Sequence, residues 1–192
     1  MSEGDYSARM ITLEDNPPTC TLSYRAIQPG ETSPHHIYPW EQEVFTIESS
    51  GTLICDGKNY PVKAGDAIYI PSNVDHYMLN DGGEGVMLRI EINSLEVARS
   101  GGASNNGGQG TGEAPVIRNE SELNRTVSHV LLNTEDALPN YVMLHNDPME
   151  QEQLATLTPE DTHAWEHVVF VLEGSGTLVS NGKNYAVPKN DA

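Results

Sequence analysis

The sequence predicts an all-β protein built from antiparallel strands, arranged as a barrel or a sandwich. Short segments rich in β-branched and aromatic residues alternate with turn sequences through the first hundred residues, and no amphipathic helix pattern interrupts them. The segment 40–67 also recurs near the end of the chain. Short strands at this spacing are typical of β-barrels and β-sandwiches.

The individual strands are expected where apolar runs lie between turn residues. Asp56-Gly57 predicts a tight hairpin within the segment 51–62. Gly51, Gly57 and Gly65 lie where turns call for a positive φ. The segment 121–132 fits a short helix as well as a strand. The expected strands are 19–27, 43–47, 51–62, 66–71, 76–80 and 85–92.

The internal repeat predicts two copies of one β module. Residues 40–67 align without gaps with 165–192 at an offset of 125, and 16 of the 28 positions are identical. We expect a complete barrel with an N-terminal arm in 1–98, a Gly-rich linker or loop in 99–114, and a partial second module in 115–192.

The second copy stops at Ala192, which corresponds to Ala67, so strands matching 68–92 are missing from it. Open strand edges are an aggregation hazard unless something covers them. Two explanations remain. The favoured one is that this chain is a fragment of a longer two-module protein, and the other is that a swapped or partner-supplied segment completes the barrel.

Charge and composition exclude several classes of partner. Acidic residues outnumber basic ones 28 to 10, for a formal net charge of -18, which disfavours nucleic acid and anionic membranes. Met1 is followed by Ser-Glu-Gly-Asp, and no stretch approaches the roughly 18 apolar residues of a membrane span. We expect a soluble, cytoplasmic protein. Cys20 and Cys55 have no ligand spacing and are expected to be buried, reduced thiols.

The first copy resembles the cupin superfamily in its first signature motif. That motif is Gly, five residues, His-x-His, three or four residues, then Glu or another ligand, and a strand ending in Gly. The chain has Gly30, His36, Tyr38, Gln42 and Gly51 at the matching positions. The pattern is similar to the "HxHPWEHEVFVLEG" core of one branch of small cupins, and both copies resemble it.

The second cupin motif also has a counterpart at the right distance. It reads Gly, five residues, Pro-x-Gly, two residues, His, three residues, Asn, and it matches Gly65, Pro71, Asn73, His76 and Asn80. Asn73 replaces the middle Gly, a mild change because Asn readily adopts positive φ. The resemblance implies an antiparallel jelly-roll barrel (a double-stranded β-helix), duplicated as a bicupin whose second copy is incomplete.

The resemblance also implies one divalent metal ion, either Mn, Fe, Ni, Zn or Cu. Residues two apart on a strand share a face, so His36 and Tyr38 point the same way, and His76 comes from another strand. We expect His36, Gln42 and His76 to bind the ion, with Tyr38 on it or beside it. A bound cation would lower the pKa of the Tyr38 phenol and recruit it as a phenolate or a general base.

The repeat helps to choose between two neighbouring candidates for the oxygen ligand. Gln42 and Glu43 face opposite ways on a strand, so one of them points inward. Their counterparts are His167 and Val168. Position 42 therefore keeps a ligand-capable side chain, and Gln42 is preferred, with Glu43 as the fallback.

The second copy offers an incomplete second metal site. It has His163 and His167, but Asp161 stands where His36 would lie. Its counterpart of His76 would follow the last residue of this chain.

The resemblance implies action on a small oxygen-rich molecule: a keto acid, a sugar acid or a phenol. The metal would assist isomerase, lyase or dioxygenase chemistry, with Tyr38 or Glu43 moving a proton. Strand alternation places Tyr24, Met78 and Arg89 toward the cavity. The alternative is a non-catalytic barrel that binds a small ligand or serves assembly. Because cupins commonly pair through sheet edges, a homodimer is also expected.

Overall fold

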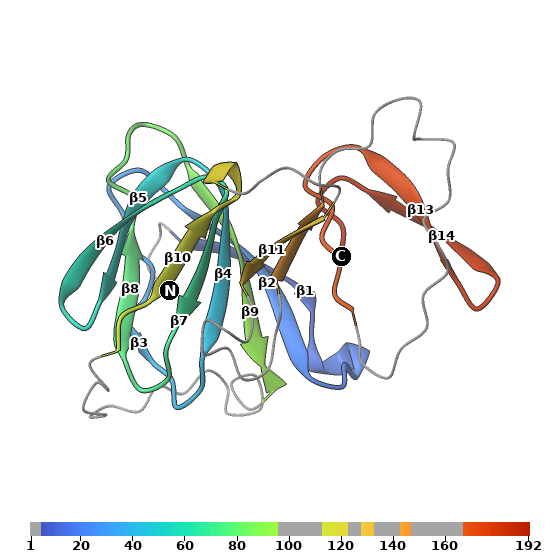
Figure 1. Ribbon diagram of the computed structural model, residues 1–192, viewed down its shortest axis with the longest axis horizontal. Coiled ribbons are helices and arrows are strands. Elements are labelled where there is room, and N and C mark those ends of the chain that lie inside the picture. Colours follow the sequence, from blue (N-terminus) through green and yellow to red (C-terminus); the bar gives the residue numbers. More distant parts are fainter. Residues whose placement is uncertain (1–4, 96–112, 123–127, 133–142, 147–166) are drawn as a thin grey trace. The chain divides into compact units, whose positions relative to one another are not determined.

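The computed structural model describes residues 5–95, 113–122, 128–132, 143–146 and 167–192 (Figure 1). The chain divides into two compact units, Met1–His145 and Asn146–Ala192. The first contains the two cupin-like motifs, and the second contains most of the repeated segment.

Short β-strands make up most of the first unit. In chain order they are β1 (Asp5–Ile11), β2 (Cys20–Ile27), β3 (His36–Ile37), β4 (Gln42–Glu48), β5 (Ser50–Cys55), β6 (Lys58–Lys63), β7 (Asp66–Ile70), β8 (Asp75–Leu79), β9 (Met87–Ser94), β10 (Val116–Asn119), β11 (Ser128–Leu132) and β12 (Met143–Asn146).

Two sheets form the barrel of the first unit. Sheet A has six strands in the order β1-β2-β9-β4-β7-β10, and sheet B has four in the order β3-β8-β5-β6. All neighbouring strands in both sheets are antiparallel. Strands far apart in sequence, such as β4 and β9, lie next to each other, as in a jelly roll. The predicted all-β, antiparallel jelly-roll fold is confirmed.

The barrel is held together by an apolar core between the two sheets. Leu53 from sheet B and Ile68 from sheet A are both 0% exposed, and Met78 and Met87 belong to the same cluster. Alternation along each strand sends these side chains to one face. Each such burial contributes about 1.5–3 kcal/mol to folding.

Gly51 lets β5 pass close to its neighbours. A Cβ at this position would collide with the Leu79 carbonyl oxygen and the Met87 methyl group. Its φ is not positive, in contrast to the φ of 69° at Gly57 and 83° at Gly65. Gly57 and Gly65 therefore lie in turns, as predicted. Gly51 does not, and is required there because the strands pack closely.

Two further turn predictions are confirmed. Asp56 and Gly57 both have positive φ, 50° and 69°, in the β5–β6 hairpin, as a tight primed turn requires. Asn73 has φ 60°, so it adopts the conformation that glycine takes in the cupin motif. Asn80 donates to the carbonyl oxygens of Ile27 and Gly85 at 2.9 and 2.8 Å, which is a structural role.

The first unit extends beyond the predicted linker. Strand β10 pairs with β7 at the edge of sheet A, with Val116 opposite Tyr69, so residues just after position 115 belong to the first unit. The division lies between His145 and Asn146. Most of the predicted linker, 99–112, lies outside the described residues. Within the ambiguous segment 121–132, residues 128–132 form strand β11.

The described helical elements are the 3-10 turns η1 (Leu13–Asp15) and η2 (Glu120–Glu122). Thr12 caps η1 and exchanges hydrogen bonds with Asp15. Among the described residues, no helix has the length and apolar character needed to span a membrane.

The second unit reproduces one hairpin of the first. Strands β13 (Ser175–Ser180) and β14 (Lys183–Pro188) pair antiparallel with Ser175 opposite Pro188. These bounds and this register are those of β5 and β6 shifted by 125 positions. The turn residues Asn181 and Gly182 also repeat the positive φ values, at 49° and 71°. The hairpin is local, so the repeated sequence suffices to specify it.

The repeated hairpin differs from the first in burial. Leu178 is 51% exposed, whereas its counterpart Leu53 is 0% exposed. The residues 167–172, which correspond to all of β4 except its last residue, do not form a strand. The described part of the second unit therefore shows a hairpin, and the second barrel stays a prediction.

This pair of leucines gives a matched test of the core. We expect Leu53→Ala to lower the free energy of unfolding by about 2–5 kcal/mol, because it leaves a cavity between the sheets. Leu178→Ala should change it by less than about 0.5 kcal/mol, because the side chain is half exposed. Urea denaturation followed by circular dichroism measures both. Equal losses in the two variants would contradict the assigned core.

Candidate functional site

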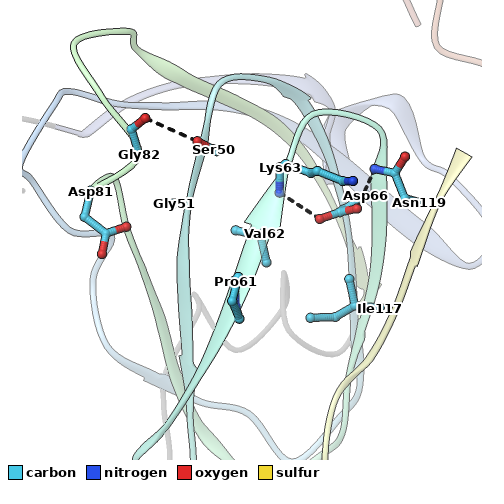
Figure 2. Close-up of a pocket in the computed structure, with 10 residues that line it drawn as sticks. All are labelled: Ser50, Gly51, Pro61, Val62, Lys63, Asp66, Asp81, Gly82, Ile117 and Asn119. Carbon is cyan, nitrogen blue, oxygen red and sulfur yellow. Dashed lines mark hydrogen bonds between the residues drawn. The ribbon is translucent and has the colours of Figure 1, made fainter. Parts of the chain in front are cut away.

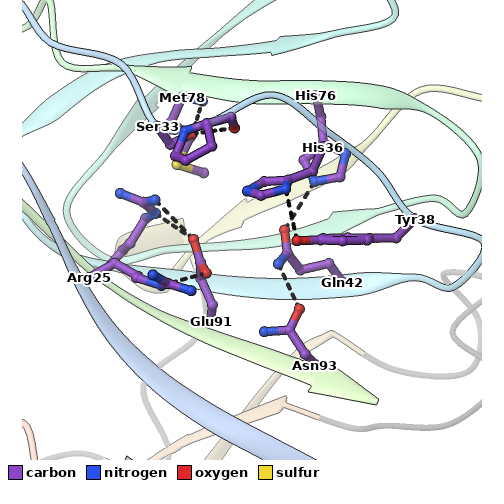
Figure 3. Close-up of polar contacts among 11 residues, drawn as sticks. Arg25, Ser33, His36, Tyr38, Gln42, His76, Met78, Glu91 and Asn93 are labelled. Atoms are coloured by element: carbon purple, nitrogen blue, oxygen red, sulfur yellow. Dashed lines mark hydrogen bonds and ion pairs between the residues drawn. The ribbon is translucent and has the colours of Figure 1, made fainter. Parts of the chain in front are cut away.

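The predicted ligands come together where the two sheets meet at one end of the barrel. His36 and His76 are directly paired on β3 and β8 of sheet B. Gln42 begins β4 of sheet A, opposite Asn93 of β9. Gln42 Oε1 lies 3.2 Å from His76 Nε2 (Figure 3). Both side chains are buried, with each residue 4% exposed.

The hydrogen bonds of His76 determine which ring nitrogen carries its proton. Nδ1 lies 2.9 Å from the carbonyl oxygen of Val74, which accepts hydrogen bonds and cannot donate them. Nδ1 therefore carries the hydrogen, and Nε2 presents a lone pair. Burial lowers the pKa of His76, which keeps the ring neutral.

Gln42 is turned so that its oxygen faces this lone pair. Its amide nitrogen donates to Asn93 Oδ1 at 2.8 Å, leaving Oε1 toward His76. Two acceptors thus face each other at hydrogen-bond distance, an arrangement that a shared cation relieves. If the amide groups of Gln42 and Asn93 were both rotated by 180°, the Gln42 nitrogen would donate to His76 Nε2 and the Asn93 nitrogen would donate to the Gln42 oxygen. All three side chains would then be paired without a cation.

His36 and Tyr38 form the other half of the cluster. The Tyr38 hydroxyl lies 2.8 Å from His36 Nδ1, and the two rings stack with their centroids 4.9 Å apart. Burial lowers the pKa of His36 to about 4. Burial, with the charge of Glu91, raises the pKa of Tyr38 to about 12. At neutral pH, the cluster therefore holds two neutral imidazoles and a protonated phenol.

The two histidines lie close enough to share a small ligand or ion, with ring centroids 6.1 Å apart. Tyr38 lies edge-on to His76 at 5.9 Å. Within the described ranges, no group of three or more His, Cys, Asp or Glu side chains is placed to hold a metal. A metal in this cluster would thus need the Gln42 oxygen together with the two imidazoles.

A charged triad lies in the same barrel interior. Glu91 of β9 accepts from Arg25 Nε at 3.1 Å and from Arg89 Nε and Nη2 at 3.0 and 2.9 Å (Figure 3). Burial opposes the ionisation of Glu91, but the guanidinium groups of Arg89 and Arg25 outweigh it and lower the pKa of the carboxyl. The carboxylate also acts electrostatically on His36 and His76, which places the triad near the histidines.

Glu43 is not brought to this cluster. It neighbours Gln42 on β4 and faces Tyr69 and Ile92 across the sheet, so it projects from the opposite side. Glu43 is 1% exposed, and neither carboxyl oxygen has a hydrogen-bond partner among the described residues. The same alternation places Tyr24 on the far side, whereas Met78 belongs to the core cluster and Arg89 to the charged triad.

Of the second predicted site, the described residues include His167. Asp161 and His163 lie outside the described residues. His167 is exposed, whereas Gln42, its counterpart, is buried.

A separate pocket of about 490 Å³ lies at the other end of the barrel (Figure 2). Asp66 there accepts from the Lys63 amide at 2.7 Å and from Asn119 at 2.6 Å. No predicted site residue lines this pocket. Its lining is Ser50, Gly51, Pro61, Val62, Lys63, Asp66, Asp81, Gly82, Ile117 and Asn119.

Sequence reasoning missed three polar residues of the site: Arg25, Glu91 and Asn93. A signal was present, because Arg89, Glu91 and Asn93 stand at every second position of one strand-like segment, between isoleucines. This pattern marks a strand with one polar face. It does not say whether that face points to solvent or into a barrel.

Comparison with known proteins agrees with this fold. Residues 23–93 match the cupin domain family, which takes in most of β2 and continues nearly to the end of β9. No curated protein matches the sequence.

Several solved structures are similar to the chain at low identity. The polyketide cyclase RemF from Streptomyces resistomycificus is 19% identical, with a TM-score of 0.45, over 62% of this chain and 72% of that one. A cupin 2 domain-containing protein from Halorhodospira halophila is 15% identical, with a TM-score of 0.44, over 48% and 65%. The salicylate 1,2-dioxygenase from Pseudaminobacter salicylatoxidans is 13% identical, with a TM-score of 0.46, over 52% and 29%.

The position of Glu43 predicts a pH dependence of stability. Burial, and next the charge of Glu41, raise the pKa of Glu43 from 4.5 to about 8. A group whose pKa is raised by folding stabilises the folded state fully at low pH, and loses that contribution as pH rises to about 8. We expect the free energy of unfolding of Glu43→Gln, relative to the wild type, to be higher at pH 8 than at pH 5.

Urea denaturation at pH 5, 6.5 and 8 measures this effect. Glu48→Gln serves as the matched control, because Glu48 ends the same strand and is exposed; its pH profile should follow the wild type. A Glu43→Gln profile that also follows the wild type would show that this carboxyl titrates alike in the folded and unfolded chain.

Proposed function

We propose that the first barrel binds one divalent metal ion through His36, Gln42 and His76, and acts on a small oxygen-rich molecule beside it. One observation carries the metal proposal: the facing lone pairs of His76 Nε2 and Gln42 Oε1, 3.2 Å apart inside the barrel. Without a cation, this orientation would leave two buried acceptors unsatisfied.

The donor set suits the expected metals. Two imidazole nitrogens and one amide oxygen are ligands for Mn, Fe, Ni, Zn or Cu and leave positions open for other ligands. When bound, such an ion would polarise a carbonyl or carboxylate oxygen, supporting isomerase or lyase chemistry, and iron would also support dioxygenase chemistry.

Tyr38 has a role that follows from its contact with His36. A histidine that ligates a metal usually donates its other ring N–H to a neighbouring acceptor. The Tyr38 oxygen, 2.8 Å from His36 Nδ1, is placed to accept that hydrogen and so to direct Nε2 inward. Its own O–H then remains available to donate to a ligand oxygen.

The raised pKa of Tyr38 favours a proton donor over a general base in the metal-free protein. Glu43 has no part in this proposal, because it projects from the other face of β4. The Tyr38 phenol is therefore the group that would donate a proton at the ligand.

The alternative function is a barrel that binds its small ligand without turnover. The lack of a placed cluster of three or more His, Cys, Asp or Glu among the described residues favours it. So does the amide orientation that satisfies His76, Gln42 and Asn93 with no cation. Tight binding of a small molecule by metal-free protein, with no product formed, would support this alternative.

Metal uptake tests the proposal directly. The chain is treated with a chelator, supplied in turn with Mn, Fe, Ni, Zn and Cu, and analysed for bound metal after dialysis. We expect about one ion per chain. His76→Ala and Gln42→Ala should weaken binding by at least the 10–100-fold that loss of a supporting partner typically costs.

Two further variants sharpen the result. Gln42→Glu should bind the metal more tightly than the wild type, because it supplies an ionised oxygen ligand. His35→Ala is the matched control, since the His35 side chain is 60% exposed and stacks on Tyr77; it should bind metal as the wild type does. Equal uptake by His76→Ala and the wild type would end the metal proposal.

A further inference from the structure

Arg89 has an unused donor inside the barrel. The residue is 2% exposed, and its Nε and Nη2 groups both contact Glu91 Oε1. Its Nη1 atom is buried and has no hydrogen-bond partner among the residues that the structure describes. A buried charged donor without a partner is costly, so an acceptor absent from the protein itself is expected at this atom.

The charges of the interior point to an anion. Arg25 and Arg89 contribute two positive charges, and Glu91 one negative charge. Glu43 lies on the opposite face of sheet A. The triad therefore has one excess positive charge in a chain whose formal net charge is -18.

The triad is reachable from solvent. The Arg25 side chain is 27% exposed and the Glu91 side chain is 12% exposed, whereas that of Arg89 is 2% exposed. His36, which is partly exposed, lies near the triad because Glu91, Arg25 and Arg89 all act on its charge.

We propose that the ligand of the first barrel is a small organic carboxylate, whose anionic oxygens are bound by Arg89 Nη1 and by the guanidinium of Arg25. This inference rests on the proposed function in placing the ligand beside the metal-site residues. It adds the chemical class of the ligand and the residues that recognise its charge.

A carboxylate fits this site better than a phosphate. Guanidinium groups bind carboxylates through parallel N–H···O hydrogen bonds. In the metal-free barrel, the single excess positive charge of the triad also matches one carboxylate, whereas a phosphate dianion would leave a buried negative charge unbalanced. A neutral analogue would leave Nη1 unpaired, so the site should reject it strongly.

The test compares carboxylates with their amides by isothermal titration calorimetry. The probes are acetate, pyruvate and benzoate, their amides, and inorganic phosphate. Each is titrated into chelator-treated chain and into chain loaded with the metal that it takes up. We expect at least one carboxylate to bind about tenfold to a hundredfold more tightly than its amide and than phosphate, with or without metal.

Variants assign the selectivity to the triad. Arg89→Met should abolish the preference for the carboxylate over the amide, and Arg25→Gln should reduce it about tenfold. Arg25→Gln alters a partly exposed side chain and keeps the test valid if Arg89→Met does not fold. Lys58→Gln removes one positive charge from the exposed first residue of β6 and should leave the preference unchanged.

The outcomes separate this inference from the proposed function. Metal uptake without any preference for carboxylate overturns the inference and leaves the metal proposal standing. Carboxylate binding that depends on Arg89 in a chain that takes up no metal supports the inference and overturns the metal proposal. Tighter binding of phosphate than of every carboxylate, or a preference that persists in both arginine variants, overturns the inference.

Discussion

The face-to-face packing of the two sheets in the first unit is the constraint on which the rest of the structure depends. Leu53 and Ile68 meet between the sheets with no exposed surface, and Gly51 allows the closest approach. This packing determines which face of every strand is interior. It brings Gln42 of sheet A within 3.2 Å of His76 of sheet B, although 34 residues separate them along the chain. The packing of the core therefore positions the residues of the candidate site, which lies at the edge of the apolar layer.

The barrel interior also contains charged groups, which stabilise the fold less than apolar side chains in the same place would. Replacing a buried ion pair with apolar side chains is often neutral or stabilising, so the triad of Arg25, Glu91 and Arg89 is poorly explained by stability. Its Arg89 Nη1 atom, which has no partner among the described residues, and its single excess charge are better explained by a ligand. The neutral histidines and the charged triad share one interior, which brings the proposed metal ligands and the proposed anion-binding groups into one site.

Comparison of the two repeats separates local from tertiary effects. Strands β13 and β14 repeat the bounds, register and turn conformation of β5 and β6, because a hairpin is specified by neighbouring residues. The burial of the repeated residues differs, since Leu178 is half exposed and Leu53 is fully buried. The repeat thus predicted the hairpin correctly, whereas the predicted division into modules stays a prediction. Pairing of β10 with β7 joins residues distant in sequence, which no local pattern reveals.

The sequence by itself determined the strands, the hairpin turns, the positive φ at Asn73 and the identity of His36, Gln42 and His76 as neighbours, because alternation and motif spacing are local properties. The tertiary structure decided that Tyr38 contacts His36, and that Arg25, Glu91 and Asn93 belong to the same interior. Alternation divides a strand into two faces without saying which is inside. That choice is made by the packing of strands from distant parts of the chain.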